Sequence, residues 1–151
     1  LKVASSNYNV VTITLDDIFK EYGPFESVRM DIEGAEALVF QDNSKKFLEG
    51  MPLGSLIFLE VHPGNYLPNS DMMSKSIDNL KKTGFSRYGL ITSGKKPDPG
   101  LIAKLGKSTE VFHEDKFERH HYSDVEFESW KEAALNEPKQ VRYIYCVKDD
   151  D

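Results

Sequence analysis

The stretch VRMDIEGAEALVF, residues 28–40, joins the end of a predicted strand to the start of a predicted helix. Residues 27–32 read as a largely apolar strand, and Asp31 and Glu33 lie where this strand is expected to end. Gly34 then allows a close backbone turn before the helix. A carboxylate in so apolar a strand needs a partner to offset its desolvation, so Asp31 is a candidate functional residue. Glu33 and Glu36 have a simpler interpretation beside the functional one, because acids at a helix start satisfy its amides and complement its dipole.

A helix is predicted shortly before this stretch. Residues 15, 18, 19 and 22 are apolar and fall on one helical face. Thr14 and Asp17 have the spacing of a capping box, and Gly23 and Pro24 predict the end of the helix. A short strand of β-branched residues is expected just before it, over 9–14.

The rest of the chain alternates in the same way. Residues 55–63 are apolar on both faces until Glu60, which favours a central parallel strand covered by helices. One helix is expected between this strand and the strand at 27–32, and another around residues 73–80. The last two strands are predicted over 85–92 and 141–148. We therefore expect one α/β domain.

Composition limits the classes of function. The chain has 151 residues, a net charge of −6 and a pI near 5.3, so a nucleic-acid partner is not expected. It contains no apolar run long enough to span a membrane, and no membrane partner is expected. The single cysteine, Cys146, excludes an internal disulfide and fits a reducing, cytoplasmic location.

The candidate site lies where two predicted strands end. In an open α/β sheet, ligands bind beyond the carboxyl ends of the strands. Asp31 and Glu33 lie on one side of the first of these strands, and Glu60 and His62 lie on one side of the next. If these strands are neighbours, the acids and the imidazole meet at one rim. His62 precedes a proline and fits an ordinary loop histidine equally well.

Three segments, TITLDDIF, VRMDIEGAEALVF and LIFLEVHP, resemble in order and spacing the second half of the FkbM-type methyltransferases. The resemblance covers about residues 10–85. It implies the C-terminal portion of a Rossmann-like methyltransferase sheet, mostly parallel with a final antiparallel strand. It also implies S-adenosylmethionine (SAM) as cofactor and a hydroxyl group of a sugar or other small molecule as acceptor.

The resemblance also assigns roles to individual residues. Asp31 would end the fourth strand beside the point of methyl transfer, and Glu60 and His62 would end the fifth. These three are the expected catalytic residues, with Asp31, Glu33 and Gly34 as cofactor contacts. Residues 85–92 and 141–148 would be the sixth and seventh strands.

Two features depart from the family pattern. The first strands and the glycine-rich cofactor loop are missing, since the ten glycines include no G-x-G pair. We therefore expect residues 1–151 to form a single partial methyltransferase domain, either a fragment of a longer enzyme or a degenerate half.

The second departure is an insertion at 93–140, poor in regular pattern, between the last two strands. It is interpreted as a cover over the substrate, an interface element or a variable surface excursion. Its histidines, His113, His120 and His121, are interpreted as solvated charge, and no metal ligands are assigned to the chain.

Three functional hypotheses follow. In the first, a SAM-dependent enzyme methylates a hydroxyl, Asp31 or His62 accepts the proton, and Glu60 orients the base or the acceptor. In the second and less favoured one, Asp31, Glu33, Glu60 and His62 hold Mg²⁺ or Mn²⁺ for hydrolysis, or for binding a diol-like acceptor. In the third, the chain is a non-catalytic half-domain whose sheet edge pairs with another chain, including a second copy, or it is a truncated product that serves as an interaction module.

Overall fold

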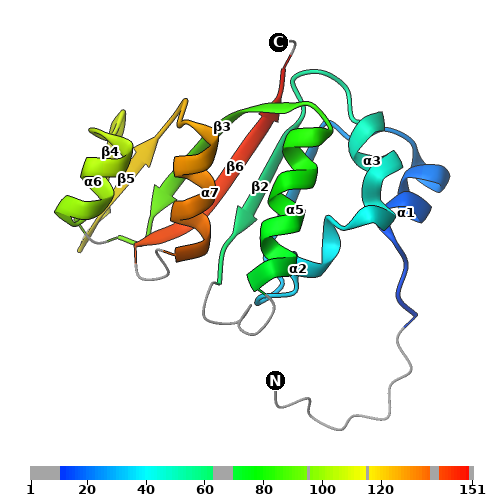
Figure 1. The fold of residues 1–151 in the computed structure, drawn as a ribbon, viewed down its shortest axis with the longest axis horizontal. Coiled ribbons are helices and arrows are strands. Elements are labelled where there is room, and N and C mark those ends of the chain that lie inside the picture. The colour runs from blue at the N-terminus through cyan, green and yellow to red at the C-terminus, as the bar shows by residue number, and fades with distance from the viewer. Residues whose placement is uncertain (1–10, 63–69, 95, 115, 137–139, 150–151) are drawn as a thin grey trace, which may run out of the picture.

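The computed structural model describes residues 11–62, 70–94, 96–114, 116–136 and 140–149, which form a mixed α/β layer structure (Figure 1). Six strands make one sheet in the order β1-β2-β6-β3-β5-β4. Their bounds are Ser27–Met30 (β1), Leu56–Glu60 (β2), Phe85–Thr92 (β3), Glu110–Glu114 (β4), Phe117–Tyr122 (β5) and Val141–Lys148 (β6). The helices are Leu15–Tyr22 (α1), Glu36–Val39 (α2), Asp42–Ser44 (η1), Lys45–Gly50 (α3), Ser70–Lys82 (α5), Pro99–Leu105 (α6) and Phe127–Asn136 (α7).

Most of the predicted elements form. β3 and β6 have the predicted bounds, and β1 and β2 are shorter than expected. The capping box of α1 is present, because the Thr14 hydroxyl accepts from the Asp17 amide and the Asp17 carboxylate accepts from the Thr14 amide. Between β1 and β2 the chain forms α2, η1 and α3 in place of the single helix expected.

The strand predicted over 9–14 is wrong in its described part, 11–14, which has no strand structure. Val11 and Ile13 are exposed there, and Thr14 serves as the N-cap of α1. Extended residues become a strand only by pairing with a neighbour, and none of the described strands pairs with this segment. Residues 9 and 10 lie outside the described part of the chain.

The expectation of a mostly parallel sheet is also wrong for the described strands. β1 and β2 are the one parallel pair, and the other four pairs are antiparallel. The reason lies in two features of the chain order. β6 runs antiparallel between β2 and β3, as expected for the last strand, and the insertion adds the antiparallel hairpin β4–β5 beside β3.

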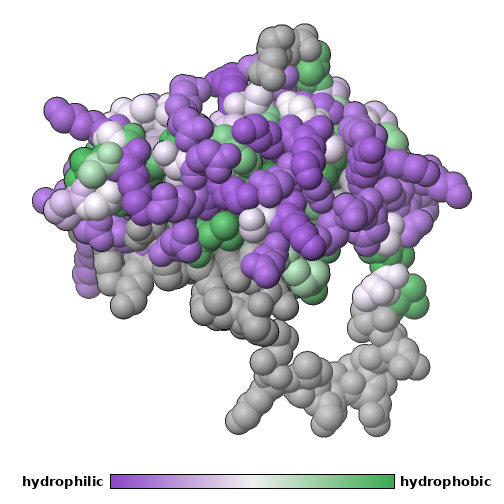
Figure 2. Space-filling model, in the orientation of Figure 1, coloured by the Kyte–Doolittle hydropathy of each residue, from purple (hydrophilic) through white to green (hydrophobic). Residues whose placement is uncertain are grey.

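The core lies between the sheet and the helices over one of its faces. Figure 1 shows α2, α5 and α7 on this face, and Met73, Ile77 and Leu80 of α5 are buried as the helical pattern predicts. The outer surface of this face is largely hydrophilic (Figure 2), because the amphipathic helices turn their polar sides to solvent. Cys146 is buried in this core, and its burial raises the pKa of the thiol. No helix among the described residues combines the length and the apolar character that crossing a bilayer requires.

The insertion at 93–140 has more regular structure than its sequence predicts. It contains α6, β4, β5 and α7, although its sequence shows little regular pattern. Trp130 of α7 is fully buried, packs on Tyr88 with ring centroids 4.8 Å apart, and donates from Nε1 to the Gly89 carbonyl at 2.8 Å. The insertion thus completes the core beside β3, and Trp130 serves as an anchor.

Candidate active site at the rim of β1 and β2

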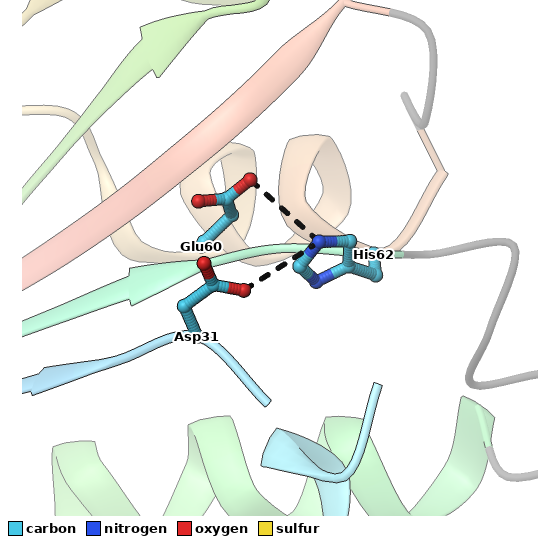
Figure 3. A group of neighbouring side chains, drawn as sticks. All are labelled: Asp31, Glu60 and His62. Carbon is cyan, nitrogen blue, oxygen red and sulfur yellow. Dashed lines mark ion pairs between the residues drawn. The ribbon is translucent and has the colours of Figure 1, made fainter. Parts of the chain in front are cut away.

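Asp31, Glu60 and His62 meet at the carboxyl ends of β1 and β2 (Figure 3). The two strands are parallel neighbours, with Met30 in register with Leu59, so the residues that follow them emerge side by side. His62 Nε2 lies 3.8 Å from Asp31 Oδ1 and 3.6 Å from Glu60 Oε1. The structure therefore brings together the three residues that the sequence placed at one rim.

Two more carboxylates reach the same imidazole. Glu33 Oε2 lies 3.6 Å from His62 Nε2, and Glu36 Oε1 lies 3.6 Å from His62 Nδ1. We call these five residues (Asp31, Glu33, Glu36, Glu60 and His62) the rim cluster. Four carboxylates thus surround one imidazole ring.

Glu36 has a larger part in this site than the sequence indicates. It is fully buried, and its Oε1 accepts a hydrogen bond of 2.8 Å from the Ile32 amide in the turn before α2. The N-cap of α2 is Ala35, with no side-chain hydrogen bond, so the expected capping of helix-start amides is not found there. Its Oε2 is also buried and has no hydrogen-bond partner among the described residues. The signal in the sequence was the position of Glu36 in the same short motif as Asp31. Its contact with His62 depends on the fold and could not be seen there.

The backbone between β1 and α2 turns through left-handed conformations. Glu33 has φ 57° and Gly34 has φ 101°. This region is open to glycine but costs other residues on the order of 1–3 kcal/mol, and such strain concentrates at functional sites. The turn reverses the chain so that the Glu33 carboxylate comes back toward His62.

Exposure divides the rim cluster into a mouth and a floor. The side chains of Asp31 and Glu33 are 43% and 78% exposed, whereas those of His62, Glu60 and Glu36 are 11%, 7% and 0% exposed. Arg142 of β6 forms an ion pair with Glu60 at the floor. A ligand approaching from solvent therefore meets two carboxylates first and reaches the imidazole behind them.

This arrangement supports two kinds of chemistry. A carboxylate beside an imidazole can accept a proton from a bound hydroxyl. Carboxylate oxygens with an imidazole nitrogen also form a donor set for a divalent cation. Among the described residues, Asp31, Glu60 and His62 are the one set of three such side chains close enough to hold an ion, with ligand atoms within 4.8 Å of one another.

Comparison with known proteins bears on the segment that carries the rim cluster. The family model described as the methyltransferase FkbM domain matches residues 2–86. This match includes all five residues of the rim cluster and ends before the insertion. Neither the curated proteins nor the solved structures contain a match to the chain. The family model covers more than half of the sequence, and the chain therefore belongs to the FkbM methyltransferase family.

Proposed function

We propose that the rim cluster takes part in the transfer of a methyl group from SAM to a hydroxyl of a sugar or another small molecule. The observation that carries this proposal is the convergence of four carboxylates on His62 at the ends of two parallel strands. The cluster lies inside the segment that matches the methyltransferase family. The α/β sheet, with an antiparallel strand between β2 and β3, is compatible with the Rossmann-like sheet that the family implies.

The mouth of the rim complements the positive groups of the cofactor. SAM supplies an electrophilic methyl group on a sulfonium, and its amino-acid end carries an ammonium beside a carboxylate. Exposed carboxylates at Asp31 and Glu33 favour positive charge at this position. Gly34 has no side chain, so a ligand can approach the backbone of the turn closely.

The proton of the acceptor hydroxyl needs a base at the same point. In our proposal it passes to Asp31 at the mouth or to His62 behind it, while the hydroxyl oxygen bonds to the methyl carbon and the sulfur keeps the electron pair of the broken bond. Glu60 and Glu36 each lie 3.6 Å from one nitrogen of the imidazole, and the surrounding carboxylates balance the positive charge that it gains with the proton.

The test compares Asp31→Asn and His62→Gln with wild type in the protein expressed from the complete reading frame. Methyl transfer from methyl-labelled SAM to a panel of sugars and polyols gives turnover, and calorimetry gives SAM affinity. Loss of a positioned base lowers turnover by roughly 10²–10⁴-fold. We expect that loss in His62→Gln with SAM affinity unchanged. For Asp31→Asn we expect a loss of turnover together with weaker SAM binding.

Glu118→Gln is the matched control, because Glu118 lies 3.7 Å from His120 and outside the rim cluster. Its turnover should equal that of wild type. Full turnover in both rim variants would remove Asp31 and His62 from the chemistry.

A binding role without catalysis is the second candidate, favoured by a largely apolar pocket whose lining includes none of the rim cluster. β1 is an edge of the described sheet, and edge strands pair readily with other chains. A cavity of about 490 Å³ opens near this edge, lined in part by Leu56, Phe58 and Tyr143. Light scattering over a wide concentration range tests this candidate, since a monomer throughout would argue against self-pairing at this edge.

A further inference from the structure

We infer that Asp31, Glu60 and His62 form a binding site for a divalent metal ion, for which Mn²⁺ is the probe. Binding of the ion does not depend on methyl transfer. Its suggested task, holding neighbouring hydroxyl groups of the acceptor, rests on the proposed function. Geometry, charge and donor type each support the site.

The distances fit ligands that share an ion better than they fit direct hydrogen bonds. His62 Nε2 lies 3.8 Å from Asp31 Oδ1 and 3.6 Å from Glu60 Oε1, beyond hydrogen-bond distance. With metal–ligand bonds of about 2.1 Å, two ligands of one ion lie roughly 3.0 Å apart when adjacent and roughly 4.2 Å apart when opposite. Both measured separations fall between these limits.

The second nitrogen of His62 faces a buried carboxylate. Glu36 Oε1 lies 3.6 Å from His62 Nδ1, on the side of the ring away from Asp31 and Glu60. Histidines that bind a metal through one nitrogen usually turn the other toward a carboxylate or a carbonyl, which fixes the ring. Glu36 lies on the side of the ring where such a partner stands, at a distance that is longer than a hydrogen bond.

The negative charge of the buried residues at the floor of the rim cluster also favours a bound cation. Within the described part of the chain, Arg142 is the only lysine or arginine that pairs with Asp31, Glu36 or Glu60, and its partner is Glu60. Glu36 is fully buried, and its Oε2 has no hydrogen-bond partner in the same part of the chain. A buried carboxylate is costly unless it is hydrogen-bonded, paired or bound to a metal. An ion on Nε2 of His62 would not be coordinated by Glu36, but its positive charge across the ring would lower this cost.

The donor types favour a transition metal. Two carboxylate oxygens and one imidazole nitrogen form a mixed set, whereas Mg²⁺ and Ca²⁺ are bound mainly by oxygen. Carboxylates suit Mn²⁺, and imidazole suits Zn²⁺ and Fe²⁺, so the set is compatible with several divalent ions. Three protein ligands would leave coordination positions for two adjacent hydroxyls of a diol. An ion there would lower the pKa of a bound hydroxyl, and His62 would then act as a ligand in place of a base.

The experiment titrates Mn²⁺ alone into the protein, without SAM or acceptor, and follows the signal of free Mn²⁺ by electron paramagnetic resonance. We expect binding in wild type and affinity weakened at least about ten-fold in Asp31→Asn, Glu60→Gln and His62→Gln. Circular dichroism reports whether each variant is folded. Asp31→Asn keeps the test decisive if Glu60→Gln misfolds, because Asp31 is half exposed.

The control is Glu118→Gln, which removes a carboxylate beside two histidines, His113 and His120, at 3.7 Å from each. We expect its Mn²⁺ affinity to equal that of wild type. Unchanged free Mn²⁺ on titration of wild type would overturn the site, and so would equal binding in wild type and folded Asp31→Asn. A loss in Glu118→Gln as large as in the rim variants would also overturn it, since the binding would then be non-specific.

The result separates this inference from the proposed function. Mn²⁺ binding that needs the three residues, in a protein that transfers no methyl group, supports the metal site and contradicts the function. Methyl transfer without any Mn²⁺ binding contradicts the metal site and supports the function.

Discussion

His62 at the rim and His120 in the insertion have similar nearest acids but very different surroundings. His62 Nε2 lies 3.6 Å from Glu60 Oε1, and His120 Nε2 lies 3.7 Å from Glu118 Oε2. Glu118 and His120 are two residues apart on β5, where alternation along the strand puts them on one side, whereas His62 lies two residues beyond the end of β2. The difference is that His62 also meets carboxylates from residues 31–36. His120 instead meets hydroxyls: Ser108 Oγ lies 3.2 Å from its Nδ1, and Thr92 Oγ1 accepts from its backbone amide.

The comparison shows which kind of neighbourhood points to a function. A histidine and a glutamate two residues apart on one strand come close together through the geometry of the strand alone. The rim cluster needs the parallel pairing of β1 with β2 and the left-handed turn at Glu33 and Gly34. Strain and buried carboxylates are costs that a fold retains where they serve a purpose. The insertion instead contributes packing, and the first two predictions test that role.

The largest expected effect is on stability, in Trp130→Ala. Trp130 is fully buried between α7 and β3 and donates a hydrogen bond to the Gly89 carbonyl. Removing a buried tryptophan side chain costs about 3–5 kcal/mol in the free energy of unfolding. Chemical denaturation measures this loss.

The matched control for Trp130→Ala is Phe117→Ala in the same insertion, where the ring is 58% exposed. It should change the free energy of unfolding by about 0.5 kcal/mol or less. Equal small losses in both variants would mean that the insertion is a surface excursion after all.

The next effect concerns Gly89, which lies in register with Tyr145 of β6. A Cβ at Gly89 would lie 2.1 Å from Tyr145 Cζ, and Tyr145 is also hydrogen-bonded to His121 Nε2 at 2.7 Å. Gly89→Ala should therefore displace the Tyr145 ring and weaken the link to the insertion. Overpacking of this kind costs about 1–3 kcal/mol.

A double-mutant cycle identifies the source of that loss. In a Tyr145→Val background the ring is gone, so adding Gly89→Ala should cost clearly less than it does in wild type. The same loss in both backgrounds would show that the ring is not responsible.

Local patterns predicted the elements that depend on local interactions. The bounds of β3 and β6 follow from apolar runs, and the start of α1 follows from the Thr14 and Asp17 pair. The meeting of Asp31, Glu60 and His62 was also predictable, because it requires only that two successive strands be neighbours.

The failures have a common physical cause, which is dependence on distant partners. Residues 11–14 have a strand composition, but they pair with none of the described strands. The hairpin β4–β5 is rich in charge, yet β5 forms a strand because β3 offers it a partner. The burial of Glu36 against His62 results from the turn at Glu33, which the sequence marks only by Gly34.

The smallest expected effect comes from replacing a non-glycine residue of positive φ by glycine. Among the described residues there are two, Glu33 at 57° and Asp124 at 53°. Glu33→Gly should raise the free energy of unfolding by about 0.5–1 kcal/mol, because relief of the left-handed strain exceeds the backbone entropy that glycine loses. It should weaken SAM binding at the same time, because one carboxylate at the mouth is lost. Thermal denaturation and calorimetry measure the two effects.

Asp124→Gly in the insertion is the control for this combined gain in stability and loss of SAM binding. Aspartate tolerates the left-handed region better than glutamate, and Asp124 forms an ion pair with Arg87 that the variant loses. We expect little change in stability and none in SAM binding. If Asp124→Gly stabilised the protein as much as Glu33→Gly, or if Glu33→Gly bound SAM as wild type does, the strain at the rim would have no functional purpose. The surroundings of His62 and His120 would then differ only in how their side chains pack.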